Sequence, residues 1–104
     1  MEFGDIFICR FPFTSGAMSK PRPALVLFDL GVDVVIRRIT STLHRGALDV
    51  PVSDWASAGL AKPSVIRLDR LLTAEKTLLG RRLGSLSTID TAAARSIWNA
   101  NMIL

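Results

Sequence analysis

The stretch SKPRPALVLF, residues 19–28, decides the fold. Pro21 and Pro23 fix their own φ angles near the extended value and push the residue before each of them out of the helical region. The run that follows, Ala24–Phe28, is apolar throughout and shows no helical period, so it predicts a buried strand. Pro23 marks the entry of that strand, which places Arg22 on a stiff backbone at the rim of the sheet. A solvated turn arginine is the alternative interpretation of Arg22.

Several further segments have the composition of strands. They are rich in valine, isoleucine and leucine, and glycine, proline or small polar residues bound them. Gly31 lies in a tight turn between two of them, which indicates a hairpin, and Pro51 confines another to an edge or an end. The expected strands are Asp5–Arg10, Ala24–Phe28, Val32–Thr40, Leu48–Val52, Ser64–Leu71 and Leu78–Leu86, with a loop at Thr73–Thr77.

Two segments have helical signals. Ser87 is a good N-cap, and Asp90 follows it three residues later, as in a capping box. A much shorter helix, of one or two turns, is expected at 55–59 behind the N-caps Ser53 and Asp54. Many short strands with one terminal helix predict a mainly β fold, a small curved barrel or sandwich with helices packed outside. The apolar spacing of the C-terminal helix comes from Ile89, Ala93, Ile97, Ala100 and Leu104.

The length of 104 residues suits one domain, 1–104, with a single core. The only cysteine, Cys9, can form no internal disulfide, which favours a reducing cytoplasm. The N-terminus lacks a basic segment followed by a long apolar one, so we expect no signal peptide. No apolar run approaches the roughly 20 residues that a membrane-spanning helix needs, and we expect no membrane partner.

The charge and hydropathy of the chain point to two kinds of partner. Thirteen Lys and Arg against nine Asp and Glu give a net charge of +4, which favours polyanions or acidic proteins. Most of the positive charges are arginines, whose planar fork suits phosphate. A hydrophobic content of 49% is high for so small a domain, so we expect part of the apolar surface to lie in a subunit interface.

Metal and cofactor chemistry find no support in the sequence. One histidine, one cysteine and no carboxylate cluster at ligand spacing predict no metal site, and no glycine-rich phosphate loop is present, so we expect no cofactor. The single histidine, His44, lies beside Arg45 in a polar stretch, and its simplest interpretation is an exposed loop residue.

Arg67 and Asp69 are two residues apart in an expected strand. Side chains at that spacing project from the same face, about 6 to 7 Å apart, so both could meet one group between them. An ordinary surface ion pair is the alternative, and it would contribute little. Thr40 and Ser41 end another expected strand, where they could serve the chemistry or merely complete a turn.

Five segments in order carry a resemblance to a known family. GDIFICRFPFT (4–14), KPRPALV (20–26), RRITST (37–42), SVIRLD (64–69) and LLGRRLGSLS (78–87) occur in the order and at the approximate spacing of the PemK/MazF toxin endoribonucleases of type II toxin-antitoxin systems. The chain resembles this family from Gly4 to about Leu86. Each segment alone is a weak signal, whereas the ordered set is specific.

The resemblance implies an SH3-like barrel, a homodimer with an RNA groove, a cognate acidic antitoxin, and metal-independent cleavage of single-stranded RNA by its own 2′-hydroxyl. It places phosphate-binding arginines at Arg22 and Arg67, a hydroxyl at Thr40 and a proton acceptor at Asp69. The loop between the first two strands would gate the groove. Some members have a histidine in that loop, which this chain lacks, so loop-histidine proton transfer is not expected. The candidate RNA-binding residues are Thr14, Ser15, Ser19, Lys20, Ser41 and His44.

Two other functions remain open at this point. A related branch with the same barrel binds gyrase and cuts nothing, but its working end is a Trp-Gly-Ile tail, whereas this chain ends in Asn-Met-Ile-Leu. A barrel that binds nucleic acid without cleaving it would need the same basic groove.

Overall fold

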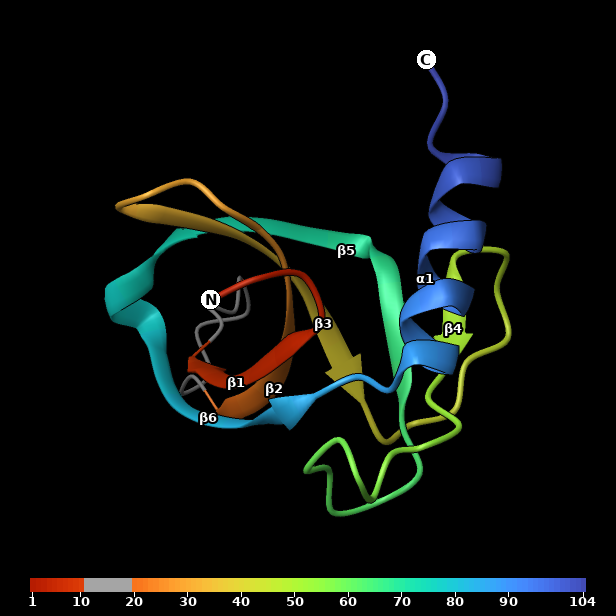
Figure 1. The fold of residues 1–104 in the computed structure, drawn as a ribbon, viewed down its shortest axis with the longest axis horizontal. Helices are drawn as coiled ribbons and strands as arrows, with labels where there is room; N and C mark the ends of the chain where they lie inside the picture. Colours follow the sequence, from red (N-terminus) through yellow and green to blue (C-terminus); the bar gives the residue numbers. More distant parts are fainter. Residues whose placement is uncertain (11–19) are drawn as a thin grey trace.

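The computed structural model describes residues 1–10 and 20–104. Figure 1 shows a curled antiparallel sheet with one helix against its right-hand end. The strands pair in the order β4-β5-β3-β2-β1-β6, and the sheet is not closed. The elements are β1 (Asp5–Arg10), β2 (Pro21–Asp29), β3 (Asp33–Thr40), β4 (Asp49–Pro51), β5 (Val65–Glu75), the 3-10 helix η1 (Lys76–Leu78), β6 (Leu79–Ser85) and α1 (Thr88–Asn101).

The sheet has a core on each face. On one face, which we call the α1 face, buried residues of the sheet pack against α1 and the segment before β5. On the other face a smaller cluster includes Cys9, where burial raises the pKa of the thiol. The α1 face includes Ile6, Leu25, Ile39, Ile66, Leu68 and Ala94, and the second cluster is formed by Cys9, Ala24, Val26, Val34 and Ile36.

The expected strands are present, with several boundaries moved. β1 has the predicted bounds, whereas β2 begins at Pro21, so Arg22 lies inside the strand and not at its rim. The expected loop at Thr73–Thr77 is wrong over its first half, because β5 continues through Glu75 in pairing with β3. Pairing with the long β3 strand extends β5 through these residues. The amino-acid composition of the segment does not predict that pairing.

The expected short helix at 55–59 is reduced to hydrogen-bonded turns. Its one α-type bond runs from Ala58 N to the Asp54 carbonyl, and Gly59 then turns back with a φ of 90°. The segment is held by close backbone contact with β6. A Cβ atom added at Gly59 would overlap the Leu83 carbonyl, and one added at Gly84 would overlap the Ala58 carbonyl. Glycine at both positions therefore permits this contact.

Helix α1 begins as predicted, but it buries a different face. The Ser87 hydroxyl accepts a hydrogen bond from Asp90 N at 3.1 Å, which confirms the N-cap. Ile89, which was expected to face the core, is 70% exposed, whereas Asp90 and Ala94 are the buried residues of the helix. The Asp90 carboxylate accepts from the backbone nitrogens of residues 53 and 54 at 2.9 and 2.8 Å. The hydrogen bonds of the buried Asp90 carboxylate to two backbone donors set the rotation of the helix. The spacing of apolar residues alone does not predict these hydrogen bonds.

Replacing Asp90 with alanine should lower the free energy of unfolding by about 2–4 kcal/mol, because two backbone donors lose a charged acceptor. Asp90→Asn keeps one acceptor oxygen, so its free energy of unfolding should lie between those of wild type and Asp90→Ala. Urea unfolding measures the change. Asp54→Ala is the matched control, since only the backbone of Asp54 contributes to these contacts. Equal stability of Asp90→Ala and wild type would contradict this role.

Gly59→Ala and Gly31→Ala separate backbone strain from packing. Both glycines have φ near 90°, but an added Cβ meets nothing within 4 Å at Gly31 and a backbone carbonyl at Gly59. Gly31→Ala should therefore cost about 1–2 kcal/mol for the left-handed conformation alone. Gly59→Ala should cost clearly more in the same thermal unfolding experiment. Equal losses would show that the contact between 53–59 and β6 is loose.

Candidate nucleic-acid interface

Two cross-strand rows gather polar side chains on one face of the sheet. In the first row Ala24 is opposite Arg38, Arg38 is opposite Arg67, and Arg67 is opposite Asp49. Directly paired residues share a face, so this row places two arginines and a carboxylate together. We call this face, opposite the α1 face, the arginine face.

The second row lies two residues further along. Arg22 precedes Ala24 by two residues in β2, Thr40 follows Arg38 by two residues in β3, and Thr40 is paired with Val65. Residues two apart in a strand share a face, so Arg22 and Thr40 lie on the arginine face with Arg38. The sheet thus brings together three of the four residues expected to carry chemistry: Arg22, Thr40 and Arg67.

Arg22 is held by its strand. The side chain is partly buried, and its Nε atom is buried with no hydrogen-bond partner in the part of the chain that the structure describes. It is paired with Cys9 of β1 between two prolines that fix the backbone. The strand therefore fixes the base of the Arg22 side chain, and its Nε–H is a donor without an acceptor among the described residues.

Arg67 contacts two residues that lie far from it in sequence. Its Nε donates to Asp49 Oδ1 at 3.1 Å, and its Nη1 lies 3.4 Å from His44 Nε2. Arginine can only donate, so Nε2 is the acceptor in this contact. Asp49 is nearly buried, with 4% of its side chain exposed, and its other oxygen accepts from Gly46 N at 2.7 Å. The carboxylate thus orients Arg67 and closes the loop that carries His44.

The hydroxyl of Thr40 completes a turn at the end of β3. Its Oγ1 accepts from Thr42 N at 3.1 Å, and the residue is 6% exposed. The neighbouring Ser41 is exposed. The turn interpretation of Thr40 is therefore confirmed. In this turn the Thr40 hydroxyl acts as an acceptor. Its proton is available for a hydrogen bond to a ligand, since no described residue accepts one from this hydroxyl.

Asp69 lies in a bulge of β5. Arg37 is opposite Leu71 while the next residue, Arg38, is opposite Arg67, so residues 68–70 fall between two consecutive pairs. A regular strand would have put Asp69 on the same face as Arg67, whereas the pairing within the bulge assigns it no face. Asp69 is exposed, and its charge acts on Arg37.

Arg38, paired with Arg67, is a further arginine of the arginine face. Burial lowers the pKa of Arg38, and the positive charges of Arg22, Arg70 and Arg67 lower it further. Arg38 Nε is also buried without a partner among the described residues. Sequence reasoning named neither Arg38 nor Asp49, because both owe their place to cross-strand register. Four guanidinium groups therefore lie near one another with Asp49 as the one carboxylate in the described contacts.

The remaining candidates are less constrained. Lys20 is exposed immediately before β2, whereas Thr14, Ser15 and Ser19 lie outside the described residues. Within residues 1–10 and 20–104, no group of three His, Cys, Asp or Glu side chains could hold a metal ion. Across the same residues, no helix combines the length and apolar character that spanning a membrane requires.

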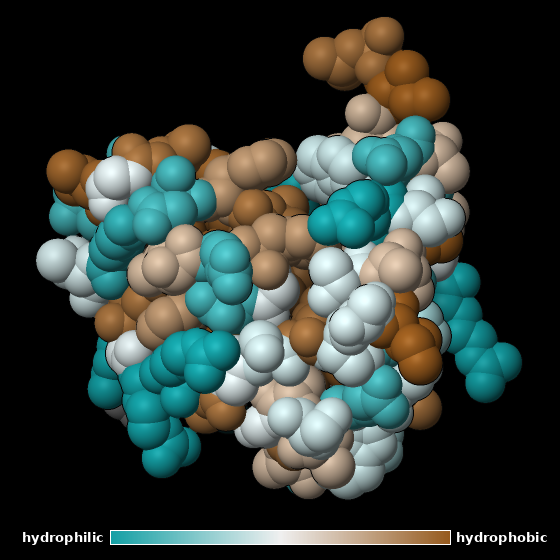
Figure 2. All heavy atoms as spheres, in the orientation of Figure 1, coloured by the Kyte–Doolittle hydropathy of each residue, from teal (hydrophilic) through white to brown (hydrophobic). Residues whose placement is uncertain are grey.

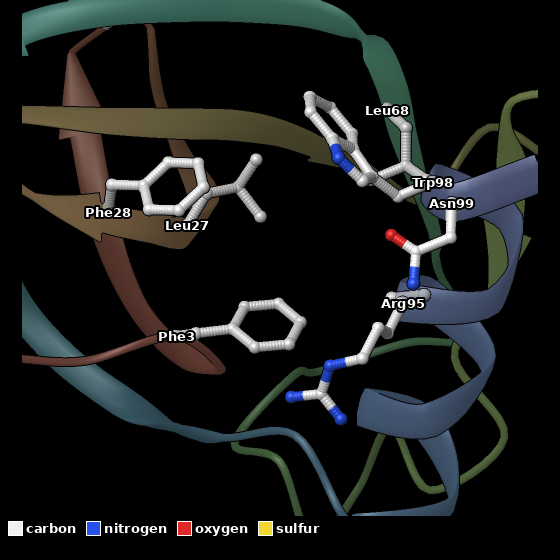
Figure 3. Close-up of a pocket in the computed structure, with 8 residues that line it drawn as sticks. Phe3, Leu27, Phe28, Leu68, Arg95, Trp98 and Asn99 are labelled. Carbon is white, nitrogen blue, oxygen red and sulfur yellow. The ribbon is translucent and has the colours of Figure 1, made fainter. Parts of the chain in front are cut away.

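An apolar hollow of about 340 Å³ lies on the α1 face, between the start of the chain, the end of β2 and α1. Figure 3 shows Phe3, Leu27 and Phe28 on one side of it and Trp98, Arg95 and Asn99 on the other. Leu68 also lines the hollow. Within residues 1–10 and 20–104, none of the residues expected from the sequence to bind RNA lines it.

Comparison with known proteins agrees with this architecture. Residues 2–97 match the model of the PemK-like, MazF-like toxins of type II toxin-antitoxin systems. No curated protein matches the chain. The toxin MazF-mt6 of Mycobacterium tuberculosis has 30% identity and a TM-score of 0.78 over 96% of this chain and 98% of its own.

Two more distant structures share the fold. An endoribonuclease in complex with its cognate antitoxin, from a Mycobacterial species, has 20% identity and a TM-score of 0.78, covering 98% of this chain and 94% of its own. MazF from Deinococcus radiodurans has 16% identity and a TM-score of 0.72, covering 97% of this chain and 94% of its own. With a family match over nearly its whole length, the chain belongs to the PemK-like, MazF-like toxins of type II toxin-antitoxin systems.

Proposed function

We propose that this toxin is a metal-independent endoribonuclease that cleaves single-stranded RNA at specific sequences by attack of the 2′-hydroxyl on the adjacent phosphate. One observation supports this most: the arginine face presents Arg22, Arg38 and Arg67 beside Thr40, with the Asp49 carboxylate paired with Arg67. Such a surface has unmatched donors for phosphate oxygens. The family membership supports the same reaction class.

The chemistry divides into charge stabilisation and proton transfer. The reaction develops extra negative charge on the phosphate oxygens, and guanidinium groups are matched to it in shape and charge. Arg22 and Arg67 take this role, because one is fixed by its prolines and the other by Asp49. The Thr40 hydroxyl adds one neutral donor. Arginine remains protonated at neutral pH, so these groups stabilise charge and do not supply the proton for the leaving 5′ oxygen.

Proton acceptance from the 2′-hydroxyl has two candidates. Asp69 is the one that the family resemblance implies, but its charge acts on Arg37 on the α1 face. His44 lies at the arginine face with Nε2 beside Arg67. Imidazole is also the side chain that exchanges a proton most readily near neutral pH. We propose His44 as the acceptor beside the Asp69 alternative, because a phosphate that binds Arg67 would release Nε2 to take the proton.

The partners follow from charge and from exposed apolar surface. An acidic antitoxin would neutralise the arginine face, as a polyanion would.

A homodimer would cover the apolar residues that stand exposed on the hairpin joining β2 and β3. A cytoplasmic toxin has access to RNA and keeps Cys9 reduced. Figure 2 shows brown apolar residues among the charged ones on one face of the molecule, and a brown tail that stands clear of the body. The exposed apolar residues include Phe28, Leu30, Val32 and Leu71.

Purified protein should cut a long single-stranded RNA into discrete fragments in the presence of EDTA. Arg22→Ala should cut about 10²–10³ times more slowly, the usual loss when one charge-stabilising donor is removed. Arg95→Ala is the matched control, because it removes one arginine from α1, beside the apolar hollow. Gel analysis of the fragments measures the rates. Binding without any cleavage by wild type would favour the non-catalytic barrel, and cleavage that stops in EDTA would contradict the metal-independent mechanism.

Variants of His44 and Asp69 decide which group accepts the proton. His44→Gln should lower the cleavage rate about 10²–10⁴ fold, since general base catalysis contributes on that scale. Asp69→Asn should leave the rate near wild type. Both rates are measured on one RNA under the same conditions. The reverse pattern would return the role to Asp69.

A further inference from the structure

We propose that Arg38 binds the phosphate next to the one that is cleaved, so that the site takes at least two consecutive phosphates of a single strand. This inference rests on the proposed function and extends it. It makes the preferred ligand an oligonucleotide with a phosphate beside the scissile one, in contrast to a dinucleotide with a single phosphate.

The position of Arg38 in the sheet is the first argument. Arg38 lies directly opposite Arg67, where paired Cβ atoms are about 5 Å apart, and diagonal to Arg22, at about 7–8 Å. Its other neighbour across the sheet is Ala24, whose methyl group offers no acceptor. The three arginines thus come from three strands, β2, β3 and β5, and cover two cross-strand rows of the arginine face, which is more than one phosphate needs.

The count of charges is the second argument. The charges of Arg22, Arg67 and Arg70 act on Arg38, and the Asp49 carboxylate pairs with Arg67. One phosphodiester carries a single negative charge, so it would leave most of this excess uncompensated. Two or more phosphates of one strand would compensate it. Like charges close together favour such a polyanion over a small anion.

The environment of the Arg38 side chain is the third argument. It is partly buried, its Nε has no partner among the described residues, and no ion pair is recorded for it there. Burial and three neighbouring cations lower its pKa, an effect that a bound anion would reverse. A structural arginine would be expected to have an acceptor.

Its neighbour Arg37 provides an internal contrast. Arg37 points to the α1 face, where it is completely buried with its guanidinium carbon 4.8 Å from the centre of the Trp98 ring. It donates to the carbonyl of residue 36 and cannot reach a polynucleotide. Of the two consecutive arginines, therefore, only Arg38 is placed to bind a phosphate.

The test measures binding of a 2′-O-methyl RNA oligomer, which cannot be cleaved, at several salt concentrations. Arg38→Ala should weaken binding and reduce the slope of log K against log salt by about 0.7, the value for one phosphate contact on a single strand. Arg95→Ala should leave the slope unchanged. Arg38→Gln, which preserves the length of the side chain, gives the same readout if the alanine variant does not fold. A wild-type slope in the folded Arg38→Gln variant would overturn the proposal.

A second measurement separates this inference from the proposed nuclease function. Wild type should cleave a trinucleotide with two phosphates faster than a dinucleotide with one, and Arg38→Gln should lose most of that preference. If no RNA is cleaved but the salt slope falls, the phosphate site stands and the nuclease function fails. If RNA is cleaved and neither the slope nor the length preference depends on Arg38, the nuclease function stands and this inference fails.

Discussion

Repulsion among like charges is the interaction on which the arginine face depends. Two unit charges about 6 Å apart at an effective dielectric constant near 20 repel by roughly 2–3 kcal/mol, and a domain is stable by only about 5–15 kcal/mol in total. Burial is the main cause that lowers the pKa of Arg38, three neighbouring arginines lower it further, and the Asp49 carboxylate pairs with Arg67. These like charges disfavour the free protein, and binding of an anion reduces their repulsion. Favourable interactions in the remainder of the fold must offset the free energy of this repulsion.

The compensation comes from a rigid scaffold around the site. β2 and β3 contribute buried side chains to a cluster on each face of the sheet. A shift of one residue in their register would exchange the two faces. The Asp90 carboxylate ties α1 to the segment before β5, and the glycine pair at Gly59 and Gly84 lets that segment approach β6 closely. Such bracing holds the guanidinium groups in place before a ligand binds, which lowers the ordering cost of binding.

Local sequence features predicted the elements, and long-range pairing decided the site. The bounds of β1, the N-cap Ser87 and the importance of the Pro-Arg-Pro stretch could all be predicted from neighbouring residues. Asp49 and Arg38 could not, since their roles follow from the residues opposite them in other strands. The expected grouping of Arg67 with Asp69 assumed a regular strand, and the bulge at 68–70 removed that assumption. Spacing within one strand is informative only while the ladder is regular.

The dipeptide Arg37-Arg38 shows how the fold gives two identical side chains different roles. On the α1 face, burial lowers the pKa of Arg37 to about 10, with Asp69 acting in the opposite direction. The pKa of Arg37 in the unfolded chain is higher, so the cost of burying the charge is fully present at neutral pH and declines only as the pH rises above about 10. Stacking on Trp98 recovers part of that cost and fixes α1 to β3. Arg37 is therefore a structural residue despite its unpartnered nitrogens, because no ligand can reach it. Accessibility, and not the lack of a partner alone, distinguishes a binding arginine from a buried one, and this criterion supports the arginine face as the proposed binding surface of this toxin.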